Sequence, residues 1–74
     1  MKKLTEVLVE ISRNGMSERC LICTEEDIRK RIPLEEFLQK HKANIKNFDV
    51  IMCSHNELMM QWEIRVKENK DVSK

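Results

Sequence analysis

Residues 33–45, with the sequence PLEEFLQKHKANI, form the clearest amphipathic helix of the chain, and the other segments are interpreted around it. Pro33 suits the first position of a helix, where its missing N–H leaves no hydrogen bond unmade. Glutamates stand near the start and lysines toward the end, as the helix dipole favours. One face of a 3.6-residue period carries Leu34, Phe37, Leu38, His41 and Ile45. We therefore expect a central helix against which the flanking segments pack.

Residues 4–12, LTEVLVEIS, fit either of two structures. The Asn14-Gly15 pair favours a β-hairpin, because both residues accept the positive φ of a type I′ turn. The alternative is a helix over residues 3–13, with Gly15 just beyond its C-terminal end. We predict the hairpin, in which the cross-strand pairs would be Glu10 with Arg19, Val9 with Cys20 and Val7 with Ile22.

A second hairpin is predicted in the C-terminal half. Residues 48–54, FDVIMCS, alternate between apolar and other side chains except at Ile51. Residues 58–67, LMMQWEIRVK, give the strongest strand pattern, with residues 54–57 as the connecting loop. An alternative helix over residues 55–68 would start from the capping-box spacing of Ser54 and Glu57. We prefer the strand, which accounts for the inward set Leu58, Met60, Trp62, Ile64 and Val66.

These elements predict an α+β fold in the order ββαββ, with two hairpins packed against one helix. Residues 24–27, TEED, resemble a helix start and add a short helical turn before the main helix. If residues 4–13 were helical instead, the order would be winged-helix-like, mostly α with one hairpin. The chain of 74 residues allows one domain, which we place at 1–68, followed by a polar and disordered tail at 69–74.

The composition is that of a small globular protein, with 41% hydrophobic and 36% charged residues. No apolar run approaches the roughly 20 residues that span a bilayer, and Glu6 and Glu10 interrupt any signal-peptide core. We expect a cytoplasmic protein without membrane contact. With one glycine in the chain there is no phosphate-binding loop, and no serine lies in a nucleophile elbow. We therefore expect neither enzyme activity nor a cofactor.

Three cysteines and a histidine carry metal-ligand atoms, and they would form a Cys3His zinc module if they converged. Against this, Leu21 and Ile22 fill the gap between the first two cysteines, and a strand would point those two cysteines to opposite faces. Free structural thiols are the preferred interpretation, with no bound metal. The zinc candidates are Cys20, Cys23, Cys53 and His55.

Residues 29–46 carry a local positive charge in a chain whose formal net charge is only +1. Basic residues can contact phosphates, but proteins that bind single strands or RNA usually add exposed aromatic side chains for base stacking. The aromatic residues here all fall on predicted core faces, so a small winged-helix DNA-binding regulator is the second choice. Its nucleic-acid candidates are Arg29, Lys30, Arg31, Lys40, Lys42 and Lys46.

The first choice is a small regulatory protein that acts by protein–protein interaction, of a size that suits an accessory or mobile-element protein. Met59 stands on the polar face of the strand at 58–67. If that strand lay at a sheet edge, its free backbone groups would pair with a second copy, giving a homodimer. The predicted partner-binding residues are Leu58, Met59, Gln61, Glu63 and Arg65.

Overall fold

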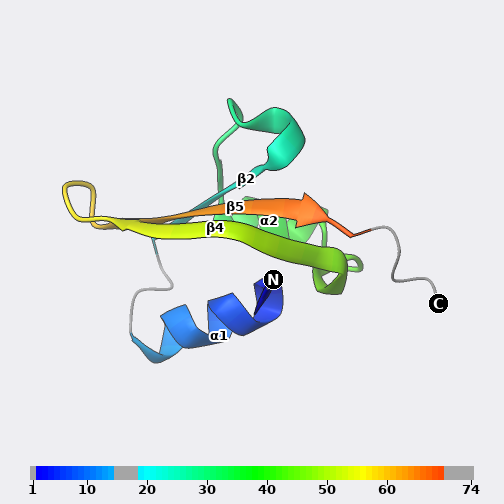
Figure 1. Ribbon diagram of the computed structural model, residues 1–74, viewed down its shortest axis with the longest axis horizontal. Coiled ribbons are helices and arrows are strands. Elements are labelled where there is room, and N and C mark those ends of the chain that lie inside the picture. Colours follow the sequence, from blue (N-terminus) through cyan, green and yellow to red (C-terminus); the bar gives the residue numbers. More distant parts are fainter. Residues whose placement is uncertain (1, 15–18, 70–74) are drawn as a thin grey trace.

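The computed structural model describes residues 2–14 and 19–69, which form a small α+β fold with two α-helices and a five-stranded mixed sheet (Figure 1). The elements in chain order are β1 (Lys2–Lys3), α1 (Leu4–Arg13), β2 (Cys20–Thr24), the 3₁₀ turn η1 (Glu25–Asp27), β3 (Ile32–Pro33), α2 (Leu34–Lys40), the 3₁₀ turn η2 (Ile45–Asn47), β4 (Phe48–Asn56) and β5 (Gln61–Glu68).

The strand order across the sheet is β1-β4-β5-β2-β3. Neighbouring strands are antiparallel except β2 and β5, which run parallel, with Cys20 opposite Trp62 and Ile22 opposite Ile64. A parallel pair needs a long connection between its strands, and here the chain between β2 and β5 forms β3, α2 and β4. The ββαββ arrangement is therefore replaced by a mixed sheet with β5 at its centre.

The core lies on one face of this sheet. β2, β4 and β5 turn alternate residues to that face, and α1 lies along it (Figure 1). Phe37 of α2 packs edge-on against Phe48, with ring centroids 5.2 Å apart. The buried core residues are Leu4, Val7, Ile11, Cys20, Ile22, Phe37, Phe48, Val50, Ile64 and Val66.

The first predicted hairpin is wrong, because residues 4–13 form helix α1. Leu4, Val7 and Ile11 are buried at helical spacing, whereas Val9 is 55% exposed. In a strand Val9 would share a face with Val7 and Ile11. The helix ends at Asn14, whose N–H donates to the Glu10 and Ile11 carbonyls at 3.3 and 3.1 Å. Gly15, the second residue of the predicted turn, lies outside the described residues.

The central helix is present but shorter than predicted. Pro33 is extended, with φ −62° and ψ 153°, and pairs with Leu21 in β3, so the helix begins at Leu34. It ends at Lys40, and the N–H of His41 donates to the Phe37 carbonyl at 2.9 Å. Residues 25–27 form only one 3₁₀ turn, so the pair of helices that a winged helix requires is not formed, and that alternative is also wrong.

The second hairpin is confirmed, since β4 and β5 pair antiparallel and the alternative helix over residues 55–68 is absent. Ile51 broke the sequence alternation because the strand has a bulge between Val50 and Met52. The strands continue to Asn56 and restart at Gln61, so the turn is later than predicted. Of the predicted tail, Asn69 is held by its amide, which donates to the Asp49 carboxylate at 3.1 Å, and residues 70–74 lie outside the described residues.

Candidate partner-binding surface

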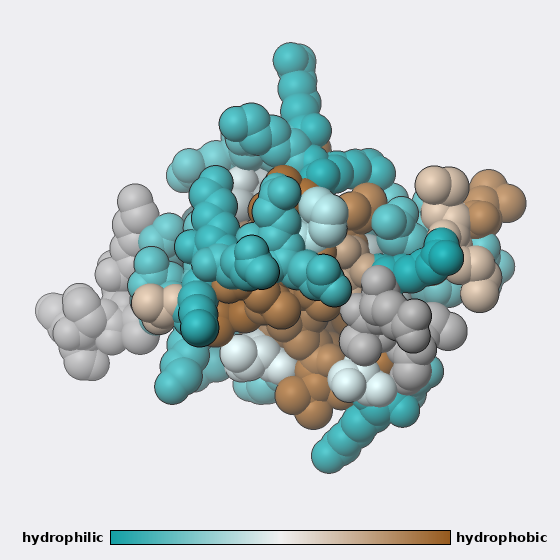
Figure 2. All heavy atoms as spheres, turned by 180° about the vertical axis from the view of Figure 1, so that it is seen from behind, coloured by the Kyte–Doolittle hydropathy of each residue, from teal (hydrophilic) through white to brown (hydrophobic). Residues whose placement is uncertain are grey.

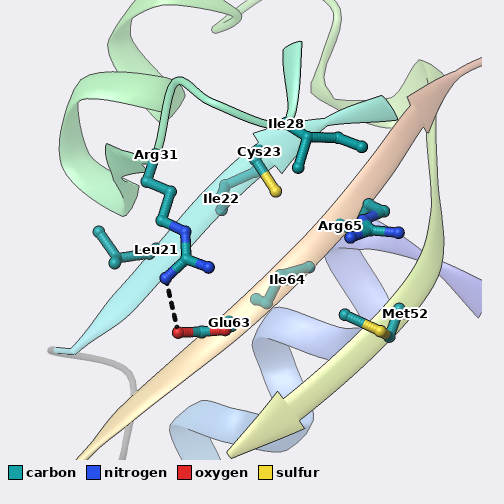
Figure 3. A pocket seen from close by; sticks show the side chains of 9 residues that line it. All are labelled: Leu21, Ile22, Cys23, Ile28, Arg31, Met52, Glu63, Ile64 and Arg65. Carbon is teal, nitrogen blue, oxygen red and sulfur yellow. Dashed lines mark hydrogen bonds and ion pairs between the residues drawn. The ribbon is translucent and has the colours of Figure 1, made fainter. Parts of the chain in front are cut away.

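The sheet face opposite the core carries polar and half-buried side chains, shown in Figure 3. Glu63 and Arg65 of β5 point to this face together with Met52 of β4 and Leu21 and Cys23 of β2. Arg31 reaches over from the segment before β3, and its Nη1 lies 2.9 Å from the Glu63 carboxylate. The hollow they surround has a volume of about 40 Å³, room for no more than a water molecule or two.

The predicted edge position of residues 58–67 is wrong. β5 lies between β4 and β2, so both of its backbone sides are paired. Glu63 is also engaged by Arg31. Gln61, Glu63 and Arg65 therefore do not form an open strand edge, and Leu58 and Met59 precede the strand altogether.

The four zinc candidates are not brought together. Cys23 is paired with Arg65 and faces the side opposite the core, while Cys20 is buried on the core face. Cys53 and His55 are on β4, two strands from Cys20, a separation of roughly 9.6 Å. No cluster of three or more potential metal-ligating side chains occurs in residues 2–14 and 19–69.

The two thiols on the core face are held in their neutral form. Burial raises the pKa of Cys20, and the nearby Cys53 raises it further. Partial desolvation also raises the pKa of Cys53, although Lys2 acts to lower it and Glu10 to raise it. A raised pKa lowers the fraction of each cysteine that is thiolate near neutral pH, and the thiolate is the form that binds metal ions and reacts with electrophiles.

The basic candidates are scattered along the segments from η1 to η2. Two of them are engaged in ion pairs, Arg31 with Glu63 and Lys30 with Asp27 at 3.6 Å. Phe37 and Phe48 are fully buried and Trp62 is half-buried, so none of the aromatic side chains is exposed for base stacking. The remaining basic candidates are Arg29, Lys40 at the end of α2, Lys42 just after it and Lys46 in η2.

The most exposed apolar group of the described residues is the turn between β4 and β5, which we call the hairpin tip (residues 57–60). Leu58 is 95% exposed, and Met59 and Met60 are 61% and 59% exposed. The tip extends beyond one end of the sheet in Figure 1, and in Figure 2 it is an apolar projection at the edge of the molecule. Sequence reasoning placed Leu58 and Met60 inside the sheet, because it began the strand three residues too early.

The tip has a defined backbone. The side-chain carbonyl of Asn56 accepts the N–H groups of Leu58 and Met59 at 3.1 and 3.3 Å, as in an Asx turn. Met60 closes the turn with φ of 52°, an uncommon conformation for a residue other than glycine. Asn56 is the sequence signal that was not used, since an asparagine side chain can accept a hydrogen bond from the backbone two residues on and so favours a turn.

Comparisons with protein-family models, curated proteins and solved structures find no match to this chain. In the described part of the chain, no helix has the length and apolar content needed to cross a membrane. The candidate site therefore depends on the geometry of the hairpin tip alone.

Proposed function

We propose that this protein is a small non-enzymatic regulatory protein that binds a protein partner, and that the hairpin tip is the contact. The supporting observation is the exposure of Leu58, Met59 and Met60 next to one another at the end of the β4–β5 hairpin. Apolar patches rimmed by polar residues commonly mark binding sites in soluble proteins. Methionine suits such a site because its flexible thioether adapts to the partner's surface.

The geometry of the tip favours binding because little order has to be gained. The hydrogen bonds that the Leu58 and Met59 N–H groups donate to the Asn56 side chain already fix the backbone of the tip, so association costs less conformational entropy than it would for a disordered loop. Burying a leucine side chain stabilises a complex by about 1.5–3 kcal/mol. The partner that fits is a protein with an apolar cleft deep enough for the Leu58 side chain.

The test compares Leu58→Ser and Met59→Ser with wild type. Proteins retained by the immobilised wild-type chain are identified, purified and titrated against each variant by calorimetry. Leu58→Ser should weaken binding by about 10- to 100-fold, the loss that corresponds to burying one leucine. The fold should be unchanged, because Leu58 makes almost no intramolecular contact at 95% exposure.

Val9→Ser is the matched control, since Val9 is an apolar residue that is 55% exposed on α1 and away from the tip. It should leave the affinity within about twofold of wild type. A purified partner that binds the Leu58→Ser and Met59→Ser variants as tightly as wild type would refute the assignment to the tip.

A further inference from the structure

The outer edge of β4 is largely uncovered. Among the residues that the structure describes, β1 comprises Lys2 and Lys3, which pair with Val50 and Asp49. In the described part of the chain, residues 51–56 have β5 on one side and no strand on the other. Residues 51–54 are exposed, and the segment therefore presents a row of free backbone N–H and C=O groups.

This edge lacks the usual protection against pairing with another chain. Residues 51–56 read IMCSHN, without lysine, proline or a carboxylate. The bulge lies at its beginning, beside β1, and the five residues 52–56 are paired with β5 without interruption. The other end of the sheet differs, because β3 has only two residues and one of them is Pro33. Short strands and proline are how edges are normally blocked.

We propose that two copies of this chain associate by antiparallel pairing of residues 52–56, about a two-fold axis at Ser54. A two-fold axis that relates two antiparallel edge strands runs perpendicular to the sheet, and the two residues of each pair face the same side of the sheet. The axis must therefore pass midway between the two copies of one residue, which pair with each other. Ser54 is the centre of the regular segment. The pairs are then Ser54 with Ser54, Met52 with Asn56, and Cys53 with His55 of the second copy, and they form roughly four to six backbone hydrogen bonds.

The side chains are compatible with this register. A groove of about 270 Å³ runs beneath the free edge, between α1 and β4, and is lined by Glu10, Cys53 and Trp62 among others. His55 of the second copy stands opposite Cys53 on the core face, so its imidazole, which packs against Trp62 of its own chain with ring centroids 5.1 Å apart, lies at the mouth of this groove. On the other face the two Ser54 hydroxyls meet, a favourable cross-strand pair.

Charge also fits at the ends of the paired segment. Continuing the register places Glu57 of one copy opposite Ile51 of the other, just before Lys2, which already occupies the position beside Val50. Lys2 and Lys3 are both exposed there. The pairing therefore stops where Glu57 of one copy lies next to the basic strand β1 of the other, in which the Lys2 ammonium also lies 3.3 Å from the Glu10 carboxylate, and the two-fold axis repeats this contact. The dimer closes, since the edge used by each copy is covered by the other.

Disulfide trapping tests the register. In a background with Cys23→Ser and Cys53→Ser, the variant Ser54→Cys places two thiols on the axis, with Cα atoms about 4.5–5.5 Å apart, within the range of a disulfide. Met52→Cys is the matched control on the same strand and face, but in this register it is offset from its own copy by roughly 14 Å along the strand. Under a glutathione redox buffer, Ser54→Cys should form covalent dimers and Met52→Cys should not.

The oligomeric state provides the second test. Wild type should sediment as a monomer–dimer mixture that shifts toward dimer with concentration, and Ser54→Lys should raise the dissociation constant by about tenfold or more, since it opposes two like charges. Ser54→Thr should remain dimeric. A wild type that is monomeric at all concentrations, or equal cross-linking of the two cysteine variants, would overturn the proposal.

This contact uses a different surface from the hairpin tip and goes beyond the proposed function. Leu58→Ser should leave the cross-linking of Ser54→Cys intact, and Ser54→Lys should leave the affinity for a tip-binding protein intact. Loss of both properties in either variant, with the fold retained, would show that they share one surface and would overturn the separate edge contact.

Discussion

The placement of α1 can be tested with two valines of the same helix, Val7 and Val9. Val7 is 5% exposed against the sheet, and Val9 is 55% exposed on the opposite side. A strand would turn both side chains to the same face, so Val7→Ala and Val9→Ala would be expected to lower the free energy of unfolding equally. The helix predicts unequal costs, and the two substitutions delete the same two methyl groups from the same element.

The magnitudes follow from burial. Two buried methyl groups contribute about 1.6 kcal/mol, and the cavity left at Val7 adds roughly 1 kcal/mol. Alanine returns about 0.6 kcal/mol through its higher helix propensity, so Val7→Ala should destabilise by about 2 kcal/mol. At Val9 the side chain is half exposed, so less than half of the roughly 1.6 kcal/mol (about 0.7 kcal/mol) is lost, and no cavity forms. The higher helix propensity of alanine offsets this loss, so the free energy of unfolding should change by about zero.

Urea unfolding followed by circular dichroism measures both free energies. A loss of about 2 kcal/mol in a domain of this size lowers the melting temperature by roughly 8–16 °C, so thermal unfolding provides a second measure. Equal destabilisation by the two substitutions, or a larger loss for Val9→Ala, would refute the helical placement of residues 4–13 and with it the groove between α1 and β4.

Two further predictions concern the thiols and the open face of the sheet. Burial raises the folded-state pKa of Cys20 above its ordinary value of 9.0, so the folded state holds this proton more tightly than the unfolded state. Stability should therefore fall as the pH rises above about 9, and Cys20→Ala should flatten that fall in urea titrations between about pH 8 and 10.5; an unchanged pH profile would contradict the burial of Cys20. The Arg31–Glu63 ion pair should contribute about 0.2–1 kcal/mol to stability in a double-mutant cycle with Arg31→Ala and Glu63→Ala, because the Arg31 side chain is more than half exposed. High salt should reduce this coupling energy. A coupling energy above about 2 kcal/mol would contradict the prediction.

The C-terminal hairpin could be predicted from the sequence because its pattern and its environment agree. Trp62, Ile64 and Val66 alternate with polar residues since the sheet is covered by helices on one face only. Ile51, the residue at which the alternation breaks, lies at the β-bulge of β4, so the break marks a real irregularity of the strand. The turn was misplaced by a few residues because Leu58 and Met60 continue the alternation without entering the sheet.

The N-terminal half was mispredicted because two local signals competed. Val7, Val9 and Ile11 fit a strand, and the Asn14-Gly15 pair is a strong hairpin signal. The helix is favoured by tertiary packing, since the spacing of Leu4, Val7 and Ile11 lets α1 cover the core face formed by β2, β4 and β5. No local rule states that β2 pairs with β5, about forty residues further along the chain.

The sheet edge was sought in the wrong place for a related reason. Alternation along residues 58–67 reports which face of the strand is buried, and it says nothing about which strands lie on either side. The edge depends instead on the extent of the neighbouring strand, and β1 as described lies beside Asp49 and Val50. Because β1 and β4 are antiparallel, residues 51–56 lie beyond the Lys2 end of β1, whereas α1 begins at the Lys3 end. Both proposed contact surfaces then belong to one hairpin, with the tip at its end and the free edge along β4. Leu58 and Ser54 allow these surfaces to be altered separately, since neither side chain supports the core.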